Sequence, residues 1–116
     1  MAYNEHLAER IRRNLMEKHI HFEEKKMMGG LCFMVNDKMC VGIVKDDLMA
    51  RVGEDLQKEN VGKNGCRPMD FTGRPMKGYV FVSPEGIDRE SDLEHWIDLC
   101  IQFNPLAKSS KKKKRG

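Results

Sequence analysis

The sequence predicts an α+β domain in which an N-terminal helix, a short middle helix and a C-terminal helix accompany an antiparallel sheet of about five strands. Apolar residues recur at helical spacing near both ends of the chain. Between these segments, short apolar runs alternate with Asn, Asp and Gly residues, as in β-hairpins. A chain of 116 residues, 40% hydrophobic and 34% charged, fits one domain with a single core.

The first helix is expected over about residues 5–17. Asn4 can cap it, because its side-chain oxygen can accept a hydrogen bond from an amide that the first turn leaves unpaired. Leu7, Ile11 and Leu15 share one face of this helix. We therefore expect an amphipathic helix that lies on the sheet.

Four apolar segments predict the next strands: residues 22–27, 31–35, 39–44 and 48–52. Asn36-Asp37 and Asp46-Asp47 separate the last three, and Asn and Asp tolerate the positive φ that tight hairpin turns require. The pattern favours an antiparallel meander.

Pairing across the first of these turns gives two apolar faces. Met34 lies opposite Met39 and Cys32 opposite Val41 on one face, while Phe33 lies opposite Cys40 and Leu31 near Gly42 on the other. Helices on one side alone leave the second apolar face open to water. We expect it to be covered either by another copy of the chain, in a homodimer, or by the chain's own long connection.

The second half of the chain completes the sheet and ends in a helix. A short helix is expected over residues 53–60, an irregular connection with two Arg-Pro-Met repeats over 62–77, and a last strand over 79–83. Ser91 and Glu94 form a capping-box pattern for the last helix, whose apolar residues include Trp96, and Pro105 ends it.

Three stretches carry a family resemblance: KKMMGGLCFMVNDKMCVGIV from residue 25, LMARVG from residue 48 and RPMDFTGRPMKGYVFV from residue 67. Together they resemble the TfoX/Sxy amino-terminal domain family over roughly residues 3–104. The resemblance implies a curved antiparallel sheet with helices packed on it, similar to the secretion-chaperone-like folds, and a bacterial host. Full-length members promote natural competence and carry a second, carboxy-terminal domain, so a stand-alone amino-terminal-type domain is expected here. The family has no established catalytic residues to carry over.

The basic residues are concentrated at the C-terminus. Six of the 21 lie at 108–115, which leaves 15 basic against 18 acidic residues, a formal charge of −3, for the rest of the chain. We therefore expect a folded domain over residues 1–106 and a disordered basic tail over 107–116. The candidate nucleic-acid contacts in this tail are Lys111, Lys112, Lys113, Lys114 and Arg115, whose binding would be weak and dependent on salt.

No residue pattern points to catalysis, a metal or a cofactor. His19 and His21 have no third ligand at convincing spacing. The four cysteines lack paired or zinc-type spacing and are expected to be reduced and mostly buried, with Cys66 the most plausible reactive thiol. No apolar run is long enough to span a membrane and none resembles a signal peptide, so a cytoplasmic protein without enzymatic activity is expected.

A basic set in and near the long connection is the candidate contact site. Arg51, Arg67, Arg74 and Lys77 could converge on an anion or on an acidic partner surface. The alternative is that ion pairs, for example with Asp70, brace the connection. The first hypothesis for function is a non-catalytic regulatory or protein-interaction module. The alternatives are a nucleic-acid-associated accessory protein that uses the tail, and a small anionic-ligand binder.

Overall fold

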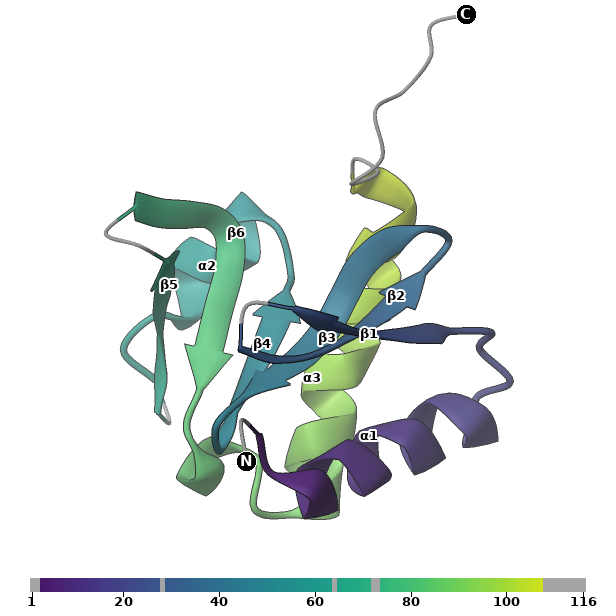
Figure 1. Cartoon of the computed structure of the whole chain (residues 1–116). Helices are drawn as coiled ribbons and strands as arrows, with labels where there is room; N and C mark the ends of the chain where they lie inside the picture. The colour runs from purple at the N-terminus through teal and green to yellow at the C-terminus, as the bar shows by residue number, and fades with distance from the viewer. Residues whose placement is uncertain (1–2, 28, 64, 72–73, 108–116) are drawn as a thin grey trace, which may run out of the picture.

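The computed structural model describes residues 3–27, 29–63, 65–71 and 74–107, without the side chains of Met27 and of residues 69–71 and 74–76. Figure 1 shows an α+β arrangement, as expected from the sequence. The elements in chain order are α1 (Glu5–Glu17), β1 (Glu23–Met27), β2 (Gly30–Val35), β3 (Lys38–Val44), β4 (Asp47–Arg51), α2 (Glu54–Asn60), β5 (Cys66–Phe71), β6 (Arg74–Val82) and α3 (Glu90–Phe103). Short 3-10 helices cover Pro84–Gly86 and Asn104–Leu106.

The strands form one open, antiparallel sheet in the order β1-β2-β3-β4-β6-β5. The expectation of an irregular connection over residues 62–77 is wrong, because β5 and the first part of β6 form a hairpin there and add a strand. Pro68 fits this hairpin because β5 lies at the sheet edge, where the missing proline N–H breaks fewer ladder hydrogen bonds. The proline and glycine residues of this segment are typical of a loop, so the sequence pattern did not indicate the strand.

The first helix begins and ends as expected. Asn4 caps α1, and its side chain accepts a hydrogen bond from the amide of Leu7 at 3.1 Å. Leu7, Ile11 and Leu15 are buried on the face toward the core. The cap and the spacing of these three residues therefore account for the position of α1.

The last helix begins two residues earlier than the capping-box pattern indicates, so that prediction is wrong. Arg89 is the N-cap residue and makes no side-chain capping hydrogen bond, and Ser91 lies inside the helix. The chain is instead held by Arg10, which donates to the carbonyl oxygens of Ile87 at 2.8 Å and Asp88 at 3.3 Å. A contact from α1 thus holds the chain just before the first turn of α3.

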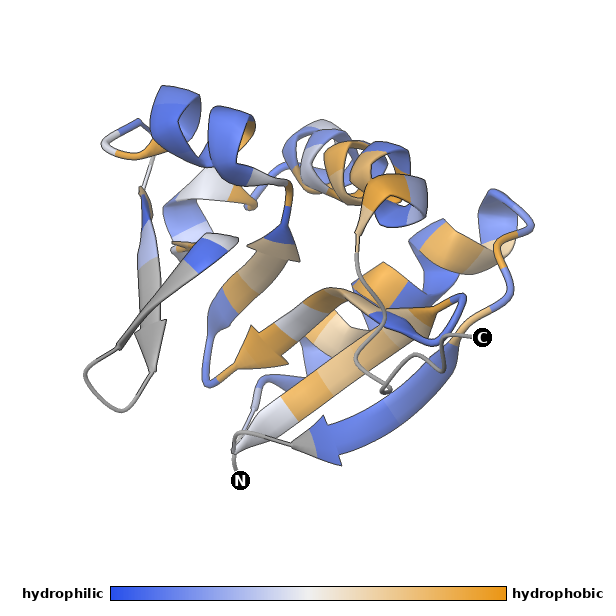
Figure 2. Cartoon of the chain, turned by 90° about the horizontal axis from the view of Figure 1, so that it is seen from above, coloured by the Kyte–Doolittle hydropathy of each residue, from blue (hydrophilic) through white to orange (hydrophobic). Residues whose placement is uncertain are grey.

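The main core lies between the sheet and helices α1 and α3. Leu93, Trp96 and Ile97 of α3 are buried in it, together with Phe33 and Leu48 from the strands. Figure 2 shows hydrophobic residues along α3 and the central strands, and hydrophilic residues along β1 and α2. The expected packing of the last helix on the sheet is confirmed.

A β-bulge changes the register that the sequence predicted. Met34 lies opposite Met39 as expected, but Leu31 pairs with Ile43, Cys32 with Gly42 and Phe33 with Val41. The register shifts between Phe33 and Met34, so Cys40 and Val41 both belong to the main core. The other predicted pairs are therefore wrong by one residue.

The hairpin turns use positive φ, as expected for Asn and Asp. Asn36 has a φ of 56° and Asp37 a φ of 64°, which suit a tight turn between β2 and β3. In the next turn, Lys45 has a φ of 58° and Asp47 already belongs to β4. That turn therefore lies one residue earlier than predicted.

Candidate interaction surface on the outer face of the sheet

The face of the sheet that points away from α1 and α3, here called the outer face, carries a second apolar cluster. Cys32, Met34, Met39 and Met49 form it. These four side chains are buried within a single chain. The structure therefore confirms that both faces of the sheet are apolar, and a second subunit is not needed to bury this one. The half-buried rings of Tyr79 and Phe81 in β6 pack against it.

Each of these rings has a guanidinium group next to it. The Cζ of Arg51 lies 5.2 Å from the centre of the Tyr79 ring, and the Cζ of Arg67 lies 5.1 Å from the centre of the Phe81 ring. Strand pairing explains both contacts, since Arg51 is opposite Tyr79 and Arg67 is opposite Phe81. We call these four residues the arginine–aromatic strip.

Arg67 also makes two polar contacts that tie the strip to β4 and to the end of β6. One nitrogen of its guanidinium donates to the carboxylate of Asp47 at 2.5 Å and another to Ser83 Oγ at 3.3 Å. Its side chain is still 48% exposed, so the group remains open to solvent. An ion pair with Asp47 thus braces Arg67, and the expected pair with Asp70 lies outside the described residues.

Arg51 is less accessible than Arg67. It is half-buried, and its Nη1 donates to the carbonyl oxygen of Met39 at 3.4 Å, a long hydrogen bond. The nearby Tyr79 hydroxyl donates to the Met39 sulfur at 3.6 Å. Burial raises the pKa of Tyr79, and the positive charge of Arg51 partly offsets that rise.

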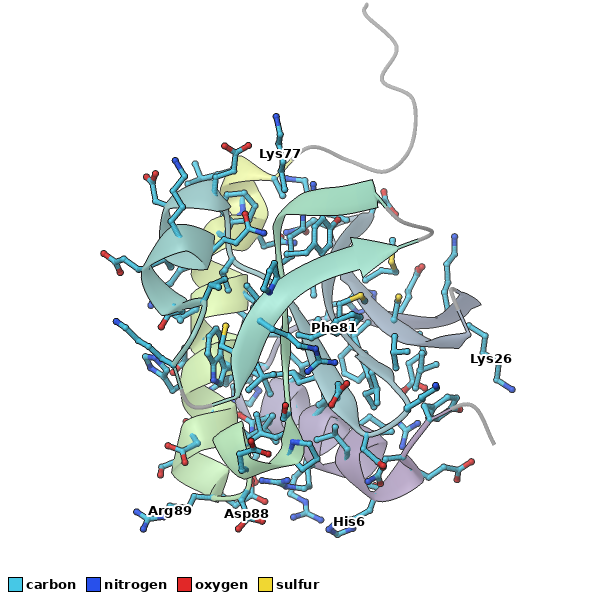
Figure 3. The ribbon with its side chains drawn as sticks, turned by 90° about the vertical axis from the view of Figure 1, so that its left-hand side faces the viewer. His6, Lys26, Lys77, Phe81, Asp88 and Arg89 are labelled. Atoms are coloured by element: carbon cyan, nitrogen blue, oxygen red, sulfur yellow. The ribbon has the colours of Figure 1, made fainter. Side chains whose placement is uncertain are left out.

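The structure brings together only part of the basic set chosen from the sequence. Arg51 and Arg67 share the outer face. Lys77 is exposed, and Figure 3 shows it projecting away from Phe81, beside the bend of β6. Arg74 begins β6, but its side chain lies outside the described residues.

A side-chain amide holds the bend of β6 beside the strip. Gln57 of α2 accepts a hydrogen bond from the amide of Gly78 and donates to the carbonyl oxygen of Tyr79, each at 3.0 Å. Gly78 has a φ of 85°, and its carbonyl oxygen accepts from the amides of Val52 and Gly53. These contacts fix Tyr79 where it meets Arg51.

Sequence reasoning finds the two arginines but misses the two rings. The sequence places Tyr79 and Phe81 in a strand, and their spacing of two puts both on one face of it. That spacing is the available signal for a shared surface. The sequence carries no comparable signal for Asp47 and Gln57, because their contacts depend on how β4, β6 and α2 pack together.

The cysteines are buried and unreactive in character. Burial raises the pKa of Cys32 to about 11 and raises that of Cys100 well above its ordinary value, where the neighbouring Cys40 thiol adds to the rise. Cys66 is also buried, and its pKa is raised in spite of the adjacent Arg67. The expectation of free, buried thiols is therefore confirmed, and Cys66 lies buried in β5 and not in an open loop.

The described part of the chain contains no group of three or more His, Cys, Asp and Glu side chains arranged to hold a metal ion. His19 and His21 are exposed, as expected. No described helix has the length and apolar character needed to cross a membrane. The tail residues Lys111, Lys112, Lys113, Lys114 and Arg115 lie outside the described residues.

Comparison with known proteins places the chain in a family. The family model for the TfoX N-terminal domain matches residues 14–104, which is most of the chain. No curated protein and no solved structure matches the sequence. The antiparallel sheet and helices α2 and α3 lie within the matched residues, and α1 lies mostly before them. The chain belongs to the TfoX N-terminal domain family.

Proposed function

We propose that this protein is a non-catalytic regulatory or protein-interaction module, and that the arginine–aromatic strip is its contact surface. The observation that carries the proposal is the placement of two guanidinium groups over two neighbouring rings on one face of the sheet. Arginine and aromatic side chains are enriched where proteins bind one another. The family, whose full-length members are regulators, suggests a bacterial and cytoplasmic setting.

The surroundings of the strip favour binding over catalysis. Chemistry by a nucleophile needs a group with a lowered pKa or an adjacent base. The thiols nearest to the strip, Cys32 and Cys66, have raised pKa values and are buried. A pair of charged groups on a rigid sheet is instead suited to holding a partner.

Quantitative affinity purification from a native lysate tests this function. The bait is the full chain, compared with an Arg51→Gln/Arg67→Gln double variant and with Lys77→Gln, which removes a charge from a surface that points elsewhere. We expect partners to be retained by Lys77→Gln and lost from the double variant, while circular dichroism shows all three folded. Equal recovery by all three baits would refute the assignment of the strip.

A second candidate function rests on the basic residues at 111–115, which can release counterions from RNA or DNA. Removing residues 108–116 should abolish such binding, and raising the salt concentration should weaken it steeply. The same guanidinium groups also offer donors to a small phosphate or carboxylate compound. Thermal stabilisation by such a compound, lost in Arg67→Gln, would identify a ligand-binding function instead.

Self-association of the chain stays a prediction, but the apolar face of the sheet no longer supports it. The outer apolar cluster, which motivated it, is already buried within one chain. A homodimer would therefore have to use other surfaces, and light scattering after size-exclusion chromatography measures whether it forms. Loss of a dimer in the double arginine variant would place the strip at the interface between two copies.

A further inference from the structure

We propose that the arginine–aromatic strip binds an extended, acidic segment of a partner protein, in which two carboxylates on the same face of the segment lie against Arg51 and Arg67. This inference rests on the proposed function and names the chemistry of its partner. It is carried by the orientation, the spacing and the charge surroundings of the two guanidinium groups.

The orientation of both groups is fixed before a partner arrives. Each guanidinium lies next to a ring that packs on a buried methionine cluster, so few side-chain conformations are lost on binding. A guanidinium has five N–H donors in one plane. Within the described part of the chain, Arg67 uses two nitrogens, for Asp47 and Ser83, and Arg51 uses Nη1 alone, so each keeps donors for a carboxylate.

The spacing fits a peptide in the extended conformation. Arg51 and Arg67 flank β6 on opposite sides and are offset by two residues along it. Arg67 reaches toward Ser83, and Arg51 reaches toward Met39, so their charged groups diverge along the strand. Strand geometry then places them roughly 10–13 Å apart, whereas side chains on one face of an extended peptide recur about every 6.6 Å. Carboxylates four residues apart on one face, about 13 Å, therefore match the strip.

The charge surroundings favour a short acidic segment over a nucleic acid. Asp47 lies beside Arg67, and the chain outside its basic tail has a formal charge of −3. A nucleic acid brings a continuous row of phosphates, so a net negative surface repels it more strongly than it repels a segment with few carboxylates. Two carboxylates meet the two guanidinium groups without a row of additional charges, and each can form charge-assisted hydrogen bonds.

Fluorescence anisotropy with two labelled peptides of the same composition tests the inference. One alternates Glu and Thr over eight residues, and the other has four Glu followed by four Thr. The full chain, Arg51→Gln/Arg67→Gln and Lys77→Gln are compared in the same buffer, so that any contribution of the tail is common to all. We expect the full chain to bind the alternating peptide about tenfold more tightly than the block peptide, because bidentate contacts to two charges are worth more than about 1.4 kcal/mol.

The double variant should lose that preference, and Lys77→Gln should keep it. Equal affinity for both peptides would overturn the inference. So would tighter binding of a single-stranded oligonucleotide that depends on Arg51 and Arg67. Affinity purification can still recover partners whose binding depends on the strip. Either result would then refute only the acidic nature of the partner segment, and the proposed interaction function would still hold.

Discussion

Asn104 and Asn36 are joined by a hydrogen bond of 2.9 Å between their side chains, which ties the end of α3 to the turn between β2 and β3. Asn104 is 3% exposed, and its Nδ2 also donates to the carbonyl oxygen of Val35 at 3.0 Å. The Lys38 ammonium donates to the backbone carbonyl oxygen of Asn104 at 3.0 Å. A buried amide with these partners fixes where the hairpin meets the last helix.

We predict that Asn104→Asp destabilises the fold by about 1–3 kcal/mol, since it removes the donor to Val35 and leaves a carboxylate facing a carbonyl oxygen. Urea unfolding followed by circular dichroism measures the change. Leu106→Ala, at an exposed position in the same 3-10 helix, is the control and should stay within about 0.5 kcal/mol. Similar stability of Asn104→Asp and the parent chain would show that the amide does not hold the turn.

Two neighbouring glycines make a matched pair of tests. Gly29 has a φ of 72°, and the space that a Cβ would enter is open within the described part of the chain, so Gly29→Ala should cost only the backbone strain of about 1–2 kcal/mol. A Cβ on Gly30 would lie 1.9 Å from the carbonyl oxygen of Ile43 in β3. Gly30→Ala should therefore cost about 3 kcal/mol or more, since a strand must move. Thermal unfolding of both variants checks the order, and a milder effect at Gly30 would contradict the close approach of β2 and β3.

The ion pair between α1 and β1 predicts a dependence of stability on pH. Two nitrogens of Arg12 donate to the Glu24 carboxylate, at 2.6 Å and 3.0 Å, and this lowers the pKa of Glu24. A lowered pKa in the folded state stabilises the fold above the unfolded value of about 4.3, and that stabilisation is lost as the pH falls through the folded value.

Arg12→Gln should therefore be less stable than the parent chain at pH 7 by up to about 1 kcal/mol, because the pair is partly exposed. The difference should shrink toward zero near pH 3. Arg13→Gln is the control, since Arg13 is exposed on the same helix. A difference that persists unchanged at pH 3 would show that Arg12 acts through packing and not through the charge of Glu24.

The four thiols should be protected in the folded protein. Each cysteine is buried, and the pKa values of Cys32, Cys66 and Cys100 are raised, so few thiolates form at pH 8. We expect Ellman's reagent to show no fast-reacting thiol in the native chain and four in denaturant. A native thiol that reacts fast and disappears in Cys66→Ser would contradict the burial of that residue.

Local patterns are sufficient to predict much of the fold. The cap at Asn4 and the spacing of Leu7, Ile11 and Leu15 identify α1, and the positive-φ residues Asn36 and Asp37 identify the first hairpin. These features depend on residues close together in the chain. The same holds for the short helix α2, which follows Gly53 as expected.

Long-range contacts determine what the sequence does not reveal. The bulge between Phe33 and Met34 changes which residues share a face, and no local signal marks it. Arg10 holds the start of α3 from another helix, so the Ser91 pattern is misleading. At the candidate site, charge and position identify Arg51 and Arg67, but their rings become apparent only when β4, β5 and β6 are paired.

We propose that binding resides in the folded sheet and not in the basic tail. The decisive measurement is the affinity of a purified partner for three chains at physiological salt: the full chain, a chain without residues 108–116, and Arg51→Gln/Arg67→Gln. We expect removal of the tail to change the dissociation constant less than about twofold and the double variant to raise it about tenfold or more. The reverse result, with binding lost on removal of the tail and kept by the double variant, would place the binding site in the tail and refute the proposal.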